Sequence, residues 1–121
     1  MAWKFNSEAP VSKQIAERLR LDILSGKYGK GSQFPTVRAL ALETAVNPNT
    51  VQKALVLLES EGLLVTQGTV GRFVTDDEKI LADMKKILQR EYIKRVIREA
   101  SSLGITKEEF IEILKNEEVE K

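Results

Sequence analysis

One segment constrains the possible folds of this chain more than any other: residues 47–62, NPNTVQKALVLLESEG. Asn47 is a favourable helix N-cap, and Pro48 follows at the first helical position, where the missing N–H of a proline costs no hydrogen bond. Gly62 is suited to end the helix. Four apolar residues between them recur at the spacing of one helical face: Val51, Ala54, Leu55 and Leu58. The segment therefore predicts an amphipathic helix with a defined start and a buried side.

Two helices are predicted before this one. Residues 10–25 carry apolar side chains at four-residue intervals, with Pro10 in the first turn and Gly26 as the stop. Thr36 can cap a short helix over residues 37–44. The inward-facing residues of these two helices are predicted to be Val11, Ile15, Ala16, Leu19, Ile23, Leu24, Val37, Leu40 and Ala41. A short helix joined by a turn of about three residues to a well-capped one favours a helix-turn-helix.

The pattern changes after Gly62 to one that is typical of strands. In LLVTQGTVGRFVT, residues 63–75, β-branched and apolar residues stand on both sides of GTVG. This predicts a β-hairpin with a four-residue connection. Three helices followed by a hairpin make a winged helix-turn-helix. We therefore predict a mostly α fold with a small β-hairpin wing, in a domain that covers residues 1–75.

Residues 76–121 are predicted to form a second, two-helix region. Nine apolar residues indicate one stripe along a helix of about 25 residues, which is too long for the first domain to cover. They are Ile80, Leu81, Met84, Ile87, Leu88, Ile93, Val96, Ile97 and Ala100. Thr106 and Glu109 predict a capping box at the start of the last helix. We expect this region to dimerise, because the stripe needs a partner surface. In the alternative, both helices fold back on the first domain.

The composition excludes several classes of function. The chain of 121 residues has no Cys and no His, which removes thiol and imidazole nucleophiles, zinc sites and disulfides. No other spacing suggests a metal, cofactor or catalytic site, so we expect that the protein is not an enzyme. No apolar run approaches 18 residues, and the N-terminus has no apolar segment. We therefore expect no signal peptide and no membrane span, and a cytoplasmic protein.

The outward face of the helix after Asn47 carries side chains that can read DNA. Asn49, Gln52 and Lys53 are predicted to lie opposite its apolar face. Asn and Gln can pair with adenine, and Lys can reach guanine or a phosphate. The helix N-terminus also favours phosphate. Residues 1–75 carry nine Lys/Arg against six Asp/Glu, whereas residues 76–121 carry ten against twelve. The charge balance therefore indicates that an anionic partner binds the first region.

Two neighbouring features support this interpretation. Arg38 is predicted in the first turn of a helix, where a cation is unfavourable unless it pairs with an anion outside. Arg72 and the tip QGTVG are predicted on the wing, where Gly68 lets the backbone approach another molecule closely. Each feature also has a structural explanation: solvation for the polar face, capping for Asn47, a surface ion pair for Arg38 and turn formation for the glycines. Their convergence on one surface favours a binding function.

Three segments resemble the DNA-binding domain of the GntR family of bacterial transcription regulators: ILSGKYGKGSQFPTVRALA, VNPNTVQKALVLLESEGLL and GTVGRFV. The resemblance covers about residues 8–75, and the two-helix tail is similar to that of the YtrA subfamily. It implies a dimer that places two recognition helices in successive major grooves of a palindromic operator, with the wings at the minor groove. The contacts that it implies come from Arg38, Asn47, Asn49, Thr50, Gln52, Gln67 and Gly68.

The sequence also departs from the commonest pattern of that family. Pro48 and Gln52 stand where many members have Arg, which implies weaker phosphate attraction and weaker guanine readout. The larger effector domains of other subfamilies do not fit in residues 76–121. The aminotransferase-like domain of another branch does not fit either, so the resemblance implies no pyridoxal phosphate site.

We therefore predict a sequence-specific DNA-binding transcription regulator, a repressor that binds a palindromic operator as a homodimer. Its partners would be double-stranded DNA, a second copy through residues 76–121 and an unidentified small-molecule effector. The alternative is a winged-helix protein-interaction module, which would show no salt-dependent affinity for any duplex. The predicted DNA-binding residues are Arg38, Asn47, Asn49, Thr50, Gln52, Lys53, Gln67, Gly68 and Arg72.

Overall fold

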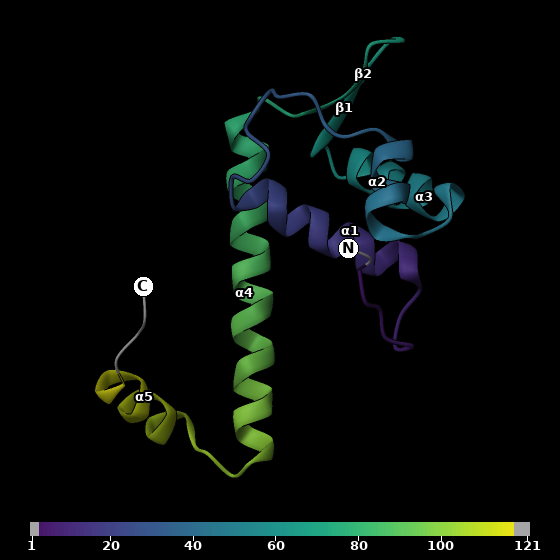
Figure 1. Cartoon of the computed structure of the whole chain (residues 1–121). Helices are drawn as coiled ribbons and strands as arrows, with labels where there is room; N and C mark the ends of the chain where they lie inside the picture. Colours follow the sequence, from purple (N-terminus) through teal and green to yellow (C-terminus); the bar gives the residue numbers. More distant parts are fainter. Residues whose placement is uncertain (1–2, 118–121) are drawn as a thin grey trace. The chain divides into compact units, whose positions relative to one another are not determined.

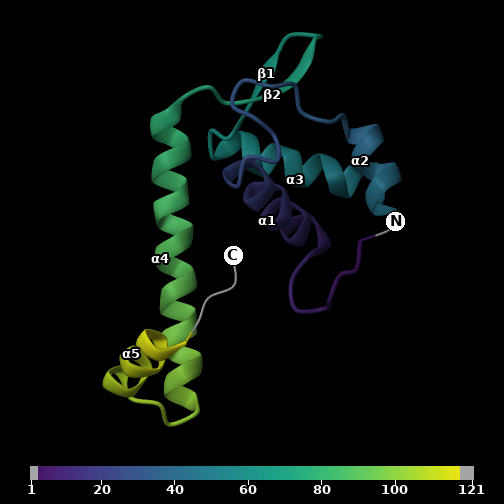
Figure 2. The same ribbon diagram turned by 60° about the vertical axis from the view of Figure 1, so that its left-hand side comes forward.

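The computed structural model describes residues 3–117, which contain five helices and two strands (Figures 1 and 2). These are α1 (Val11–Leu24), α2 (Val37–Thr44), α3 (Pro48–Ser60), β1 (Leu64–Gln67), β2 (Gly71–Val74), α4 (Glu78–Ser102) and α5 (Lys107–Asn116). Their order confirms the predicted winged helix-turn-helix followed by two C-terminal helices. The chain divides into two compact units after Met84, so the first turns of α4 belong to the same unit as the winged domain.

The hydrophobic core of the first unit lies between α1, α2 and α3. One face of each helix is buried, as the apolar periodicity predicts. The buried residues on these helices are Ile15, Ala16, Leu19, Ile23, Leu40, Val51, Ala54, Leu55 and Leu58, and the other predicted inward residues are half-buried at its margin. Burying one Leu or Ile side chain contributes about 1.5–3 kcal/mol. The α1–α3 contact therefore fixes which side of α3 faces outward.

The start of α1 differs slightly from the prediction. Pro10 is the N-cap residue rather than a residue of the first turn, with an extended backbone at φ −54° and ψ 142°. Its carbonyl oxygen accepts hydrogen bonds from the N–H groups of Lys13 and Gln14 at 3.1 and 3.2 Å. A proline fits this position because an N-cap needs its carbonyl oxygen but not its N–H inside the helix.

The turn between α2 and α3 has the predicted three residues, from Ala45 to Asn47. Ala45 adopts a left-handed conformation with φ 58°, which ends α2 sharply. A non-glycine residue in this region costs about 1–2 kcal/mol, so packing of the two helices must hold it there. Asn47 then caps α3, and its Oδ1 accepts a hydrogen bond from the N–H of Asn49 at 2.8 Å. The turn thus directs α3 across α2 as a helix-turn-helix requires.

The wing is a two-stranded antiparallel hairpin that extends beyond α2 and α3 (Figure 1). The predicted four-residue connection is wrong: Gly71 pairs with Gln67, so only residues 68–70 connect the strands. The N–H of Val70 donates to the carbonyl oxygen of Gln67 at 2.9 Å and closes this turn. Gly71 has φ +133°, a conformation that favours glycine and lets the chain re-enter the ladder one residue earlier.

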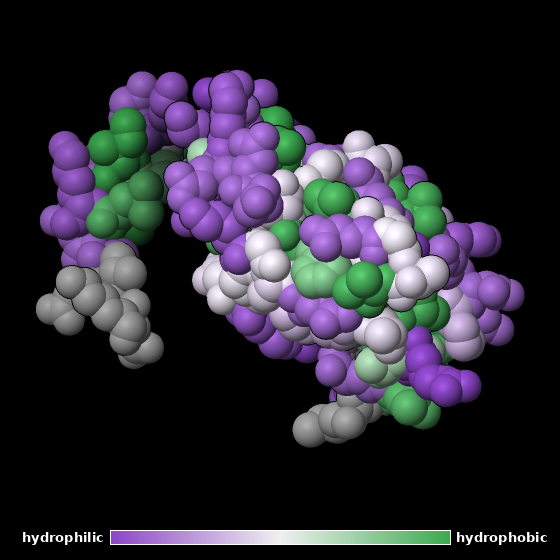
Figure 3. Space-filling model, turned by 90° about the horizontal axis from the view of Figure 1, so that it is seen from above, coloured by the Kyte–Doolittle hydropathy of each residue, from purple (hydrophilic) through white to green (hydrophobic). Residues whose placement is uncertain are grey.

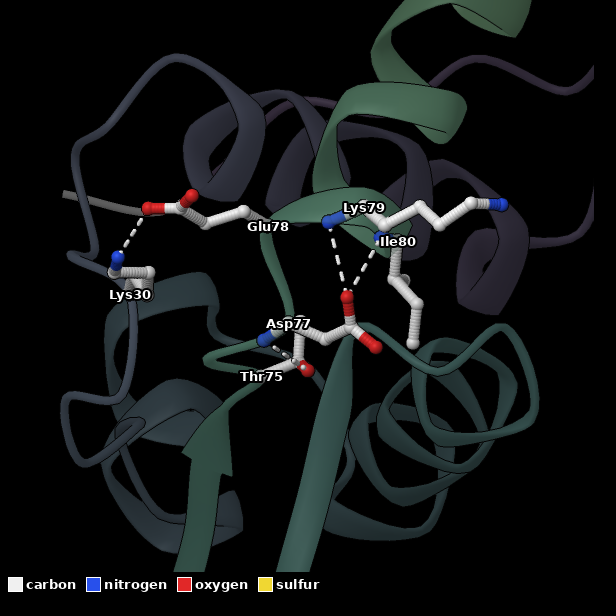
Figure 4. A network of polar contacts seen from close by, with 6 residues as sticks. All are labelled: Lys30, Thr75, Asp77, Glu78, Lys79 and Ile80. Carbon is white, nitrogen blue, oxygen red and sulfur yellow. Dashed lines mark hydrogen bonds and ion pairs between the residues drawn. The ribbon is translucent and has the colours of Figure 1, made fainter.

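A polar network marks the passage from the wing into α4 (Figure 4). The Oδ1 atom of Asp77 accepts hydrogen bonds from the N–H groups of Lys79 and Ile80 at 2.9 and 3.3 Å. Two free N–H groups at the start of α4 are therefore satisfied. Lys30, in the loop before α2, pairs with Glu78 at 2.5 Å between Nζ and Oε1. The helix consequently starts at Glu78, two residues after Asp76, the first residue of the predicted two-helix region.

The apolar residues of α4 do not form the single stripe that the sequence analysis predicted. Ile80, Leu81 and Met84 pack against the core of the first unit. At about 100° per residue, the group around Ile93 and Ile97 lies on roughly the opposite side of the helix. The first group is therefore partly buried, whereas Ile93 and Ile97 are exposed. The packing of the first group also shows that the start of α4 does fold onto the winged domain.

Helix α5 begins as predicted. Thr106 Oγ1 accepts a hydrogen bond from the N–H of Glu109 at 3.1 Å, and Glu109 Oε1 accepts one from the N–H of Thr106 at 3.2 Å. This reciprocal pair confirms the capping box. No side chain of α5 is buried in the described part of the chain. The apolar side chains of α5 are therefore exposed and can contact another surface.

Candidate nucleic-acid interface

The outer face of α3 carries the polar residues that the sequence places there. Asn49, Gln52 and Lys53 are exposed, while Val51 and Ala54 on the other face are fully buried. Because α1 and the core hold one side of the helix, its polar side cannot rotate inward. None of these three side chains forms a hydrogen bond or ion pair within residues 3–117. Their donors and acceptors are thus free to contact another molecule.

The N-terminal end of α3 combines a structural role with binding capacity. The Oδ1 atom of Asn47 is used in the cap, but its side-chain NH₂ group has no partner among the described residues. Thr50 is half-buried in the first turn. The first turn of α3 contains no acidic residue. The positive end of the helix dipole is therefore not neutralised from within the helix, which favours a phosphate nearby.

Arg38 lies at the second position of α2 and is exposed. Thr36 caps this helix by accepting a hydrogen bond from the N–H of Ala39 at 3.1 Å. The first turn of α2 contains no acidic residue, and Arg38 forms no ion pair within the described range. The structural explanation that a surface ion pair accounts for this arginine therefore has no support in the described residues.

The wing tip is exposed from Gln67 to Val70. A groove of about 270 Å³ separates the hairpin, residues 66–72, from the segment that enters α2, residues 33–37. The side-chain amide of Gln33 crosses to the tip and donates to the carbonyl oxygen of Val70 at 3.1 Å. This contact links the wing tip to the segment that enters α2.

Arg72 is the one predicted DNA-binding cation that the structure places in an ion pair. Its Nε donates to Glu59 Oε1 at 2.9 Å, and the side chains of Arg72 and Glu59 are 19% and 26% exposed. The hydroxyl of Thr66 donates to the other carboxylate oxygen of Glu59. The Thr66 hydrogen bond and then Arg72 lower the pKa of Glu59 below its ordinary value, and burial opposes them. Sequence analysis missed Glu59, because the contact joins residues 13 positions apart.

The surface chemistry suits a polar partner. On the face seen in Figure 3, hydrophilic side chains surround smaller groups of apolar side chains. Interfaces with DNA are more polar and more positively charged than interfaces between proteins. Within residues 3–117, no helix combines the length and the apolarity that a membrane span requires.

This fold and this site define the class of domain to which residues 11–74 belong. A short helix, a three-residue turn, a capped helix with a free polar face and a hairpin beside it constitute a winged helix-turn-helix DNA-binding domain. Residues 11–74 match the family described as "Bacterial regulatory proteins, gntR family". The chain belongs to the GntR family and is a DNA-binding transcriptional regulator. The family also confirms the expectation that the protein is not an enzyme.

Three similar proteins cover the chain to different extents. The "HTH-type transcriptional repressor YtrA" of Bacillus subtilis is 33% identical over 110 residues, which are 90% of this chain and 85% of YtrA. A GntR family transcriptional regulator from Listeria monocytogenes has a structure with TM-score 0.85 and 32% identity, covering 94% of this chain and all of that one. The DNA-binding domain of AraR in complex with operator ORX1 has TM-score 0.56 and 26% identity, covering 62% and 95%. The YtrA-like character of the short chain is thereby confirmed.

Proposed function

We propose that this regulator is a repressor that binds a palindromic operator as a homodimer in the cytoplasm. The observation that carries the proposal is the exposed polar face of α3, formed by Asn49, Gln52 and Lys53, opposite a fully buried face. A capped amphipathic helix of this kind fits the major groove of B-DNA. Repression is supported by the similarity to YtrA, which is a transcriptional repressor, and operator binding by the likeness to the AraR domain.

The proposed contacts divide into base readout and positioning. Asn49 and Gln52 would each present an amide to adenine, and Lys53 would reach guanine or a phosphate. Arg38, Asn47 and Thr50 would position the two helices on the backbone. Gln67 and Gly68 at the wing tip would approach the minor groove. With few cations on this surface, sequence preference would rest more on adenine than on guanine.

The proposed dimer forms through residues 76–121. Beyond Met84 the helices expose large apolar side chains that have no partner in the described part of the chain, among them Ile93, Ile97, Ile111 and Leu114. Exposed apolar area of this kind marks an interaction surface. Between Lys85 and Arg98, α4 carries six basic residues and one acidic residue, whereas α5 carries three acidic and two basic ones. A second copy can therefore supply both apolar area and opposite charge.

One experiment tests binding, symmetry and the rival module together. Duplexes bound by the full chain would be selected from a random pool at a stated salt concentration and sequenced. We expect a palindrome with half-sites about one helical turn apart. Sedimentation of the protein with and without the selected duplex gives the number of copies bound. If no duplex binds with salt-dependent affinity, the protein-interaction module replaces the repressor.

A further inference from the structure

We propose that Glu59 and Arg72 form a strut that fixes the wing to α3, so that the wing tip and the recognition helix meet DNA as one rigid surface. Arg72 is then a positioning residue rather than a DNA contact, and this assignment replaces its predicted role. The inference rests on the proposed function, because it concerns how the DNA-binding surface is held.

One carboxylate holds both strands of the hairpin. Thr66 on β1 and Arg72 on β2 are direct partners in the ladder, so their side chains lie on the same face of the hairpin. Thr66 donates to Oε2 of Glu59, and Arg72 donates to Oε1. Glu59 lies in the last turn of α3. Both oxygens of one side chain thus bind across the strand pair and leave the hairpin little freedom to rotate about α3.

The other side of the hairpin is held by the backbone of the segment before α2. The N–H of Phe34 donates to the carbonyl oxygen of Arg72 at 2.8 Å, and the N–H of Gly31 donates to that of Val74 at 3.1 Å. The N–H of Val74 in turn donates to the carbonyl oxygen of Ser32 at 2.9 Å. These bonds order the base of the wing. The strut is the side-chain link between the hairpin and α3.

The strut also decides the charge that the wing presents. Arg72 is the one charged residue between Leu64 and Val74. Because its guanidinium pairs with Glu59, the wing presents uncharged groups to DNA: amide, hydroxyl and backbone groups and the exposed side chain of Val70. Contacts of this kind depend on position and groove shape, and they release few counterions. The salt dependence of binding should therefore come from Arg38 and Lys53.

The test compares wild type with Arg72→Gln and Glu59→Gln on two duplexes. One is the selected operator, and the other carries substitutions in the flanks beside the half-sites, where the wings lie. We expect each variant to lose about fivefold in affinity for the operator, which is about 1 kcal/mol. Each should also lose discrimination between the two duplexes, while Arg72→Gln keeps the wild-type salt slope. The double variant should lose no more than either single variant, because both disrupt the same contact.

Two outcomes of the DNA-binding experiment would overturn the strut. If Arg72→Gln lowers the salt slope by about one and keeps flank discrimination, Arg72 meets a phosphate instead. If both variants discriminate between the two duplexes as wild type does, the pair has no positioning role.

Amide hydrogen exchange of the protein without DNA tests the strut independently of the proposed DNA-binding function. Glu59→Gln should speed exchange in residues 64–74 and leave residues 51–58 protected, even if no duplex binds wild type. Equal exchange in the wing of both proteins would refute the strut.

Discussion

Arg20 of α1 binds Glu61, the C-cap residue of α3, through two hydrogen bonds, from Nε to Oε1 at 2.8 Å and from Nη2 to Oε2 at 2.6 Å. The two side chains are 11% and 22% exposed. Bidentate pairs between arginine and carboxylate are among the stronger polar contacts in proteins. This pair joins the two helices whose packing decides which face of α3 points outward.

Arg20→Ala should lower the free energy of unfolding by about 1–3 kcal/mol, because Glu61 is left without its partner at a partly buried position. Urea unfolding at fixed protein concentration, followed by fluorescence of Trp3, measures the winged domain. Trp3 is the single tryptophan and stacks under Arg18, 4.0 Å from its guanidinium carbon. Lys79→Ala is the control, since its pair with Asp83 is exposed and should contribute less than about 0.5 kcal/mol. Equal losses in both variants would contradict the prediction.

Arg38→Ala should lower the salt slope of operator binding by about one, because Arg38 is proposed to meet a phosphate. A loss of about 1–3 kcal/mol confined to one base pair would instead show that Arg38 reads a base. The physical reason is its exposure at the start of α2 without an ion pair in the described residues. Fluorescence anisotropy over a series of salt concentrations separates the two cases. Lys13→Ala removes another exposed cation, on α1, and should change neither quantity. Unchanged affinity and slope in Arg38→Ala would end its proposed role.

Gln52→Ala should relax the preference for adenine at one operator position by about 1–3 kcal/mol, because a bidentate amide contact is lost. Competition between duplexes that differ at that single base pair measures the change. Affinity for unrelated DNA should stay the same, because the substitution removes no charge. A uniform loss over all sequences would instead place Gln52 on the phosphate backbone.

Ile97→Glu should convert the dimer to monomer at micromolar concentration, because the substitution puts a charge into the proposed apolar contact. Sedimentation velocity reports the change, and binding to the palindrome should fall while binding to a single half-site stays weak and unchanged. Leu21→Glu is the matched control, because Leu21 is also an exposed apolar residue but lies on α1 of the first unit. A dimer that persists in Ile97→Glu would show that the interface lies elsewhere.

The pH dependence of stability should differ between wild type and Glu59→Gln. The Thr66 and Arg72 contacts lower the pKa of Glu59 in the folded protein below its ordinary value of 4.5. The stabilisation is therefore complete above pH 4.5 and is lost as pH falls through the lowered folded-state pKa. Unfolding in urea from pH 7 to pH 3 should show the advantage of wild type over the variant shrinking with acid. Glu17→Gln removes an exposed carboxylate from α1 and is the control for the loss of one negative charge.

Sequence alone predicted those features that arise from contacts within about four residues. Asn47 caps α3 and Thr106 with Glu109 caps α5 as expected, because a cap needs only a suitable side chain beside the first free N–H groups. The buried face of α3 was also predicted, since apolar residues spaced at the helical period lie on one side of the helix, and that side faces the core. The exposed set of Asn49, Gln52 and Lys53 follows from the same geometry.

Tertiary structure decided the rest. The hairpin connection is one residue shorter than predicted, because Gly71 enters the ladder in a conformation that the pattern of apolar residues does not reveal. The first apolar residues of α4 pack on the core of the winged domain, a contact between distant parts of the chain that apolar spacing does not specify. The ion pair of Arg72 with Glu59 depends on the hairpin folding back along α3. When two residues are far apart in the sequence, the packing of whole helices and strands decides whether their side chains meet. The local spacing of residues does not reveal such a contact.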